Sequence, residues 1–149
     1  MYIAFQKKNE KNCFNRLISF FTKSDIIHCE LVSIKNTKEF FGYSSYPNDG
    51  VRSAWIPYDP SEWIFIELKD VNTKDIKDFF ERTKGRKYDY LGCLGFVFGN
   101  PDNPKRYFCS EWCAEALGLE NPSKISPGKL YKIFEGEKRW LILRVFKWN

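Results

Sequence analysis

Four short runs rich in β-branched and aromatic residues occupy residues 26–34, 39–45, 51–56 and 63–68, and short polar or proline-bearing turns separate them. Runs of this length between such turns are typical of strands. The connection at residues 35–38 is short and polar, as expected for a hairpin loop. With a further weak alternation at residues 2–6, these runs predict a central antiparallel sheet.

Helical patterns flank this sheet. Residues 12–22 place apolar side chains near one helical face, and a second helix is predicted from Thr73, as its cap, to Gly85. Residues 109–117 predict a third helix, which ends at Gly118. A serine–proline pair at residues 126–127 opens a short helix through residue 133, and residues 140–146 are interpreted as a final apolar strand.

These elements predict one α+β domain over residues 1–149, with no internal repeat or linker. Hydrophobic residues make up 43% and charged residues 29% of the chain, so there is enough apolar material for a core and too little excess charge for global disorder.

The net charge of +5 comes from 24 basic and 19 acidic residues. The basic residues fall in short groups at residues 7–8, 84–87 and 105–106, so we interpret the surplus as an aid to solubility and expect no nucleic-acid partner. No apolar run approaches the ~20 residues needed for a membrane span. Charge follows the first apolar run, which inverts the order of a secretory signal and predicts a cytoplasmic protein, or one of the host cytoplasm if a phage encodes it.

The five cysteines are an odd number without paired spacing, which predicts reduced thiols. Cys109 stands at the start of a predicted helix, where the helix dipole lowers the pKa of a thiol. His28, the single histidine, lies on a predicted strand that could face it. The two residues are a candidate nucleophile–base pair, although on pattern alone Cys109 is more often a small buried hydrophobe and His28 a packing residue.

A metal site is the other alternative for these residues. Cys109 and Cys113 are one helical turn apart and would supply three ligands together with His28, whereas structural zinc sites usually take four. We therefore expect no metal and no other cofactor. The three remaining cysteines lie in apolar runs and are interpreted as core residues: Cys13, Cys29 and Cys93.

Two further features have both structural and functional interpretations. Arg52 follows a turn at Asp49 and Gly50 and could hold a substrate carboxylate or phosphate, but one surface arginine on a strand is the commoner situation. The tryptophans could line a groove for an acyl chain or a sugar, but we interpret most of them as core or interface anchors: Trp55, Trp63, Trp112, Trp140 and Trp148.

Three motifs, taken in their order along the chain, resemble one known family. They are HCELV on an early strand, GRKYDYLG in the middle and YFCSEWCAEALGL on a later helix. They are similar to the permuted NlpC/P60-type cysteine hydrolases of the papain-like superfamily, the group that includes YiiX-like bacterial proteins and lecithin:retinol acyltransferase-like enzymes. The histidine strand precedes the cysteine helix here, which is the permuted order. The resemblance covers roughly residues 20–120 and implies a papain-like fold whose central sheet packs against the nucleophile helix.

The resemblance also implies roles for individual residues. Cys109 matches the nucleophile, His28 the base, and Tyr88 the tyrosine that lines the site and approaches the oxyanion. The family usually takes its third polar residue from the strand after the histidine strand, which here offers Tyr43, Ser44 and Ser45. Glu30 is an alternative because it shares a strand face with His28, although two positions along a strand are separated by about 7 Å.

The resulting hypothesis is a thiol hydrolase or acyltransferase that cleaves an amide or ester bond in a peptide, a cell-wall fragment or a lipid. The alternative is a catalytically silent binding module of the same fold that recognises a polyanion or a lipid or protein partner.

Overall fold

The computed structural model describes residues 1–8, 24–92 and 105–146, the last ten of them by their backbone. Five antiparallel strands form one sheet in the order β4-β3-β2-β1-β5. These strands are β1 (Tyr2–Lys7), β2 (Ile26–Lys35), β3 (Glu39–Tyr46), β4 (Gly50–Pro57) and β5 (Trp63–Glu67). The predicted α+β class and the antiparallel sheet are confirmed, and β1 lies inside the sheet between β2 and β5.

Strands β2 and β3 stay paired over only part of their length. Their register runs from Leu31 opposite Tyr43 to Lys35 opposite Phe40, with an irregularity between Val32 and Ile34. The earlier part of β2, which carries His28, pairs with β1. The two strands therefore separate at the end of the sheet where His28 lies.

The sheet has an apolar core on each face because successive side chains alternate between faces. The smaller core contains Ala4, Val32, Phe40 and Trp63. The rings of Phe40 on β3 and Trp63 on β5 are 4.8 Å apart, although two strands lie between them in the sheet order. The sheet is therefore strongly coiled and encloses this smaller core.

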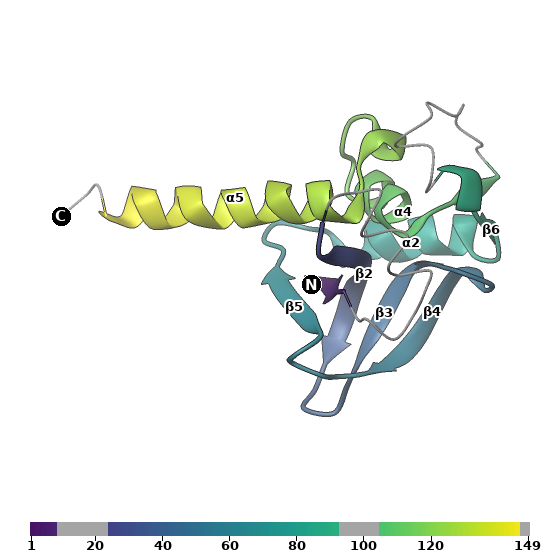
Figure 1. The fold of residues 1–149 in the computed structure, drawn as a ribbon, viewed down its shortest axis with the longest axis horizontal. Helices are drawn as coiled ribbons and strands as arrows, with labels where there is room; N and C mark the ends of the chain where they lie inside the picture. Colours follow the sequence, from purple (N-terminus) through teal and green to yellow (C-terminus); the bar gives the residue numbers. More distant parts are fainter. Residues whose placement is uncertain (9–23, 93–104, 147–149) are drawn as a thin grey trace.

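The larger core lies between the other face of the sheet and the helices α2 (Thr73–Thr83), α4 (Cys109–Ala116) and α5 (Pro127–Phe146). Figure 1 shows α2 and α4 over the upper part of the sheet, with α5 running past its edge. Side chains from all three helices join the sheet residues in this core, among them Ile76, Trp112 and Leu130. The packing of the Cys109 helix against β2 and β3 is as predicted.

Short elements connect the helices. Two-residue strands β6 (Lys87–Tyr88) and β7 (Arg106–Tyr107) pair in parallel just before α4, and the 3₁₀ turn η1 (Pro122–Lys124) follows α4. Asn72 caps α2 one residue before the predicted cap, and its side chain accepts a hydrogen bond from Lys74 N–H at 3.0 Å. Gly85 and Gly118 follow their helices with φ of 79° and 70°, the left-handed conformation predicted for such stops.

The expectations for the C-terminal region are wrong. Residues 140–146 belong to α5 rather than to a strand, and the helix that begins after Ser126 continues to Phe146 instead of ending at residue 133. A seven-residue apolar run does not distinguish strand from helix by itself, and a continuous helix already leads into it. The helix predicted at residues 12–22 lies outside the described residues. Among the helices that the structure describes, none is long and apolar enough to span a bilayer.

Candidate active site

His28 and Cys109 meet where β2 and β3 separate. His28 lies on β2 and is 6% exposed, and Cys109 is the first residue of α4 and is 1% exposed. The two side chains are hydrogen-bonding neighbours, and each changes the pKa of the other. The structure thus brings together the two residues that the sequence offered as nucleophile and base.

The surroundings of the pair favour its charged form. Hydrogen bonding to the Cys29 thiol lowers the pKa of Cys109 most, and although burial opposes this, the charge and hydrogen bond of His28 leave that pKa well below its usual value. Burial acts to lower the pKa of His28, but the charge and hydrogen bond of Cys109, followed by those of Glu30, raise it to about 10. A thiolate and an imidazolium are therefore the favoured forms near neutral pH.

Glu30 is the residue that contacts the imidazole. Its Oε1 lies 3.0 Å from His28 Nε2, and its side chain is fully buried. The separation of about 7 Å between alternate strand positions is a backbone distance, and the glutamate side chain is long enough to close it. Because Nε2 is taken by Glu30, Nδ1 is the ring nitrogen left for the thiol.

Arg52 holds Glu30 from β4. Its two terminal nitrogens donate to the two carboxylate oxygens at 3.1 and 2.9 Å, and its guanidinium lies 4.9 Å from the centre of the Tyr46 ring. Burial would raise the pKa of Glu30, but His28 and then Arg52 lower it below its usual value. The interpretation of Arg52 as a surface arginine is wrong, and Glu30 occupies the guanidinium that could have held a substrate anion.

Gly42 on β3 makes room for this carboxylate. A Cβ atom at position 42 would collide with Oε2 of Glu30. The sequence reasoning did not single out Gly42, although a glycine inside a strand often indicates such a close approach.

Ser44 and Ser45 support the backbone on both sides of the pair. Ser44 Oγ donates to the carbonyl of Cys29, next to His28, and Ser45 Oγ donates to the carbonyl of Tyr107, each at 2.7 Å. These bonds direct both hydroxyls to backbone carbonyls, so the structure does not bring Ser45 to the imidazole.

Tyr88 is buried on β6, directly opposite Tyr107 on β7, and its ring centre lies 5.0 Å from that of Tyr90. It therefore packs beside the segment that leads into Cys109.

The other described cysteines lie near Cys109. Cys29 is a core residue as predicted, but its thiol also hydrogen-bonds with Cys109. The Cys113 thiol lies 3.8 Å from the carbonyl oxygen of Cys29. Within the described ranges, no three His, Cys, Asp or Glu side chains are arranged to hold a metal ion, which includes the alternative of His28, Cys109 and Cys113. Cys13 and Cys93 lie outside those ranges.

The start of α4 offers backbone donors beside the thiol. Glu111 accepts the N–H of Phe108 at 3.2 Å, and the first helical bond runs from Trp112 N–H to the Phe108 carbonyl at 3.1 Å. The N–H groups of Cys109 and Ser110 belong to the first turn, where a helix has no internal acceptors. They are available to stabilise a developing oxyanion.

The tryptophans divide between core and surface. Trp63 and Trp112 are buried as predicted, and Trp112 Nε1 donates to Thr83 Oγ1 at 2.9 Å. Trp55 is 48% exposed, so it is not a core anchor. The side chains of Trp140 and Trp148 lie outside the described part.

No family model matches the chain, and no curated protein matches it. Among solved structures, it is similar to the crystal structure of a protein described as metalloprotein YiiX, DUF1105, from Escherichia coli O157:H7, with a TM-score of 0.51 and 16% identity. The match covers 83% of this chain and 76% of that one. The chain shares the fold of YiiX, and YiiX-like proteins belong to the group that the three sequence motifs resemble.

Proposed function

We propose that the chain is a cysteine hydrolase or acyltransferase of the permuted NlpC/P60 type, with a papain-like arrangement of nucleophile helix and histidine strand. The observation that carries this proposal is the buried series of contacts from Cys109 through His28 and Glu30 to Arg52. It supplies a thiolate, a proton donor and a fixed orientation of the imidazole ring, which are the groups that nucleophilic cysteine catalysis requires.

In the proposed reaction, the Cys109 thiolate attacks the carbonyl carbon of an amide or ester. The first-turn N–H groups of α4 stabilise the oxyanion, and His28 Nδ1–H gives its proton to the leaving nitrogen or oxygen as the bond to the carbonyl carbon breaks. The acyl group is then a thioester of Cys109. His28 takes a proton from water, or from an acceptor alcohol or amine, as that molecule attacks the thioester and releases the thiolate.

A metal has no part in this proposal, although the name of YiiX describes a metalloprotein. The described donors near Cys109 do not suit a metal, because the Glu30 carboxylate is already bound by His28 and Arg52. The thiols of Cys29, Cys109 and Cys113 interact with one another, and the Cys113 thiol also contacts the Cys29 carbonyl.

Limited iodoacetamide labelling followed by mass spectrometry tests the proposal. Cys109 should be alkylated first at pH 7, because the neighbouring His28 helps to lower its pKa whereas burial raises the pKa of Cys29. The remaining cysteines serve as internal controls. His28→Ala should raise the apparent pKa of Cys109 and remove that preference.

Hydrolysis of p-nitrophenyl acetate provides the second measurement. Cys109→Ser should abolish the activity and leave the thermal midpoint within a few degrees, since the change is nearly isosteric. Five thiols of ordinary reactivity in the native chain, or full esterase activity in the serine variant, would refute the enzyme and favour the binding module.

A further inference from the structure

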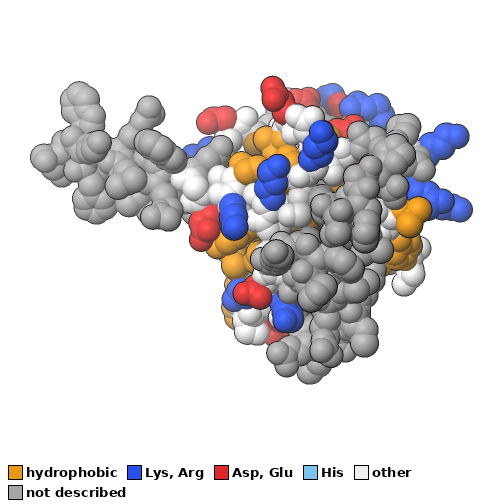
Figure 2. Space-filling model, turned by 45° about the horizontal axis from the view of Figure 1, so that its top comes forward, with side chains coloured by type: hydrophobic (Ala, Val, Ile, Leu, Met, Phe, Trp, Pro, Cys, Tyr) orange, Lys and Arg blue, Asp and Glu red, His pale blue; other side chains and the backbone are white. Residues whose placement is uncertain are grey.

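The structure brings together two basic groups that the sequence separates. Lys87 on β6 lies directly opposite Arg106 on β7, because these two short strands pair in parallel. Figure 2 shows lysine and arginine side chains at the right-hand end of the molecule, the end where Figure 1 places β6, as well as across the rest of the visible face. Two cations that are 19 positions apart in the sequence are therefore neighbours in the fold.

A surface pocket of about 210 Å³ lies at this place. Its walls are the turn at residues 48–50, together with Gly85, Lys87, Tyr88, Tyr90 and Arg106. Three separate segments of the chain thus converge on one cavity, and two of its side chains carry positive charge.

Hydrogen bonds fix the walls of the pocket. The Tyr90 hydroxyl accepts the N–H of Asn48 at 3.0 Å and donates to its Oδ1 at 3.1 Å. Val51 N–H donates to the Arg86 carbonyl and Gly85 N–H to the Val51 carbonyl, both at 2.8 Å. Gly50 has φ of 70°, and a Cβ there would collide with the Arg86 carbonyl oxygen. The pocket is therefore formed before any ligand arrives.

Its cations are available to a ligand. Within the described ranges, neither Lys87 nor Arg106 forms an ion pair, and Asp49 is the single carboxylate among the lining residues. Arg86, by contrast, is directed at Tyr107, whose hydroxyl it reaches at 3.3 Å. We propose that this pocket binds a carboxylate or phosphate group through Lys87 and Arg106.

Two segments of the chain connect the pocket with the candidate active site. Tyr46, whose ring centre lies 5.2 Å from that of His28, begins the turn that forms one wall. Arg106 stands three residues before Cys109, which limits the distance between their Cα atoms to about 10 Å. The bound anion would thus be a charged group of the substrate near the scissile bond. This placement rests on the proposed function, whereas anion binding itself does not.

NMR titration of the ¹⁵N-labelled full-length Cys109→Ser chain tests the pocket without requiring catalysis. Methyl phosphate and N-acetylalanine, added separately at constant ionic strength, are the probes. We expect saturable shifts of the backbone amides of Gly50, Gly85 and Arg106. The added substitutions Lys87→Gln and Arg106→Gln should weaken binding by about tenfold or more, because each removes a charge-assisted contact.

The matched control carries Lys69→Gln and Lys132→Gln, which remove the same charge from exposed positions elsewhere and should leave the titration unchanged. Saturation by methyl phosphate identifies a phosphate-bearing substrate, and saturation by N-acetylalanine a peptide carboxylate; either supports the pocket. Shifts that do not saturate, or that persist in the Lys87 and Arg106 variant, overturn it and leave the hydrolase proposal standing. Saturable binding in a protein whose Cys109 proves unreactive would retain the pocket and refute only its role in catalysis.

Discussion

Glu30→Gln isolates the contribution of one buried charge. The native carboxylate accepts two hydrogen bonds from Arg52 and contacts His28 at 3.0 Å. A glutamine can reproduce the contacts of Oε1, but its amide NH₂ would then face an arginine N–H, donor against donor. The substitution therefore leaves the Arg52 guanidinium without a counter-charge while changing the side-chain volume very little.

The expected cost follows from the burial of the pair. Removing one partner of a buried ion pair costs about 3–5 kcal/mol. The Glu30 side chain is 0% exposed, whereas that of Arg52 is 18% exposed and keeps some contact with water, so we expect the lower end, about 3 kcal/mol. In a chain of this size that loss corresponds to a fall of roughly 6–12 °C in the thermal midpoint.

Urea unfolding at several pH values measures this loss. Because the native pKa of Glu30 is lowered, its stabilising effect is present above the usual glutamate value of 4.5 and is lost as the pH falls through the native pKa. The difference between native and variant proteins should therefore be full at pH 7 and shrink in acid. The pH at which Cys109 labelling is half-maximal should also rise, since Glu30 no longer helps to keep His28 protonated.

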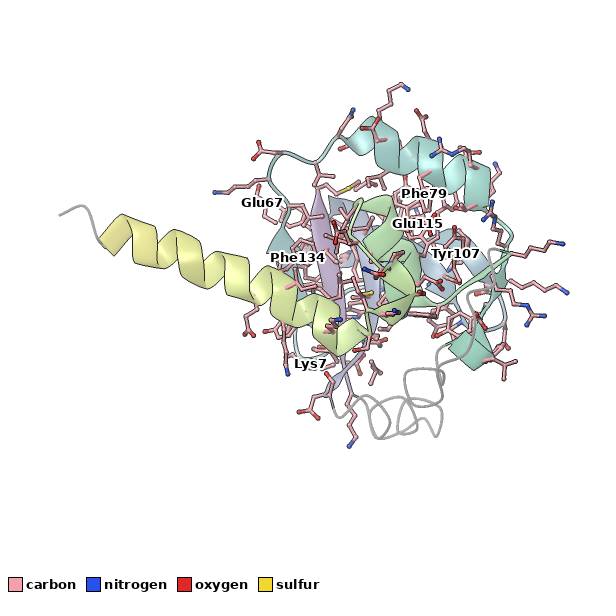
Figure 3. The ribbon with its side chains drawn as sticks, turned by 90° about the horizontal axis from the view of Figure 1, so that it is seen from above. Lys7, Glu67, Phe79, Tyr107, Glu115 and Phe134 are labelled. Atoms are coloured by element: carbon pink, nitrogen blue, oxygen red, sulfur yellow. The ribbon has the colours of Figure 1, made fainter. Side chains whose placement is uncertain are left out.

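Glu67→Gln is the matched control. Glu67 is exposed on the edge strand β5, and Figure 3 shows it on the opposite side of the sheet from Tyr107. Its substitution should change stability by no more than about 0.5 kcal/mol. A Glu30 variant as stable as this control at pH 7, with an unaltered labelling profile, would refute the account of the buried charge pair.

Gly42→Ala should destabilise the protein by about 1–3 kcal/mol in urea unfolding, because the new methyl group displaces the Glu30 side chain. The control Gly136→Ala has open space around its Cβ and should be neutral or stabilising. Equal effects of the two substitutions would contradict the steric argument. Cys29→Ala should raise the pKa of Cys109 in pH-dependent labelling, because it removes the interaction that lowers that pKa most. An unchanged labelling profile would refute this. The purified chain should keep its melting temperature in excess EDTA. One zinc ion per chain by elemental analysis, together with unfolding on chelation, would refute the hydrolase proposal in favour of a structural metal site.

The sheet and its helices were largely predictable because their signals are local. Strand boundaries agree with the sequence patterns to within one or two residues, since turns such as residues 47–49 interrupt the apolar runs. The stops at Gly85 and Gly118 require left-handed backbone that glycine adopts readily. The strand predicted at residues 140–146 was wrong, because the helix that precedes this apolar run, rather than the composition of the run, decides its conformation.

The candidate site was predictable only in part. A cysteine at a helix start and a lone histidine on a strand are visible in the sequence, and the strand period already places Glu30 on the face of His28. The contribution of Arg52 was not visible, because it depends on the register between β3 and β4 and on the missing Cβ of Gly42. The proximity of residues 84–87 to residues 105–106 depends on a two-residue parallel pairing, which has no periodic signature.

The separation of β2 and β3 explains one feature that strand alternation alone would forbid. His28 and Cys29 are consecutive on β2, so their side chains point to opposite faces, yet both lower the pKa of Cys109. The start of α4, which packs against both β2 and β3, therefore lies at the end of the sheet where the pairing of these two strands stops. The Ser44 hydroxyl on β3 donates to the Cys29 carbonyl on β2, and the Ser45 hydroxyl donates to the Tyr107 carbonyl just before α4. The two hydroxyls that the sequence offered as catalytic groups thus tie β3 to the backbone next to His28 and to the segment that leads into Cys109.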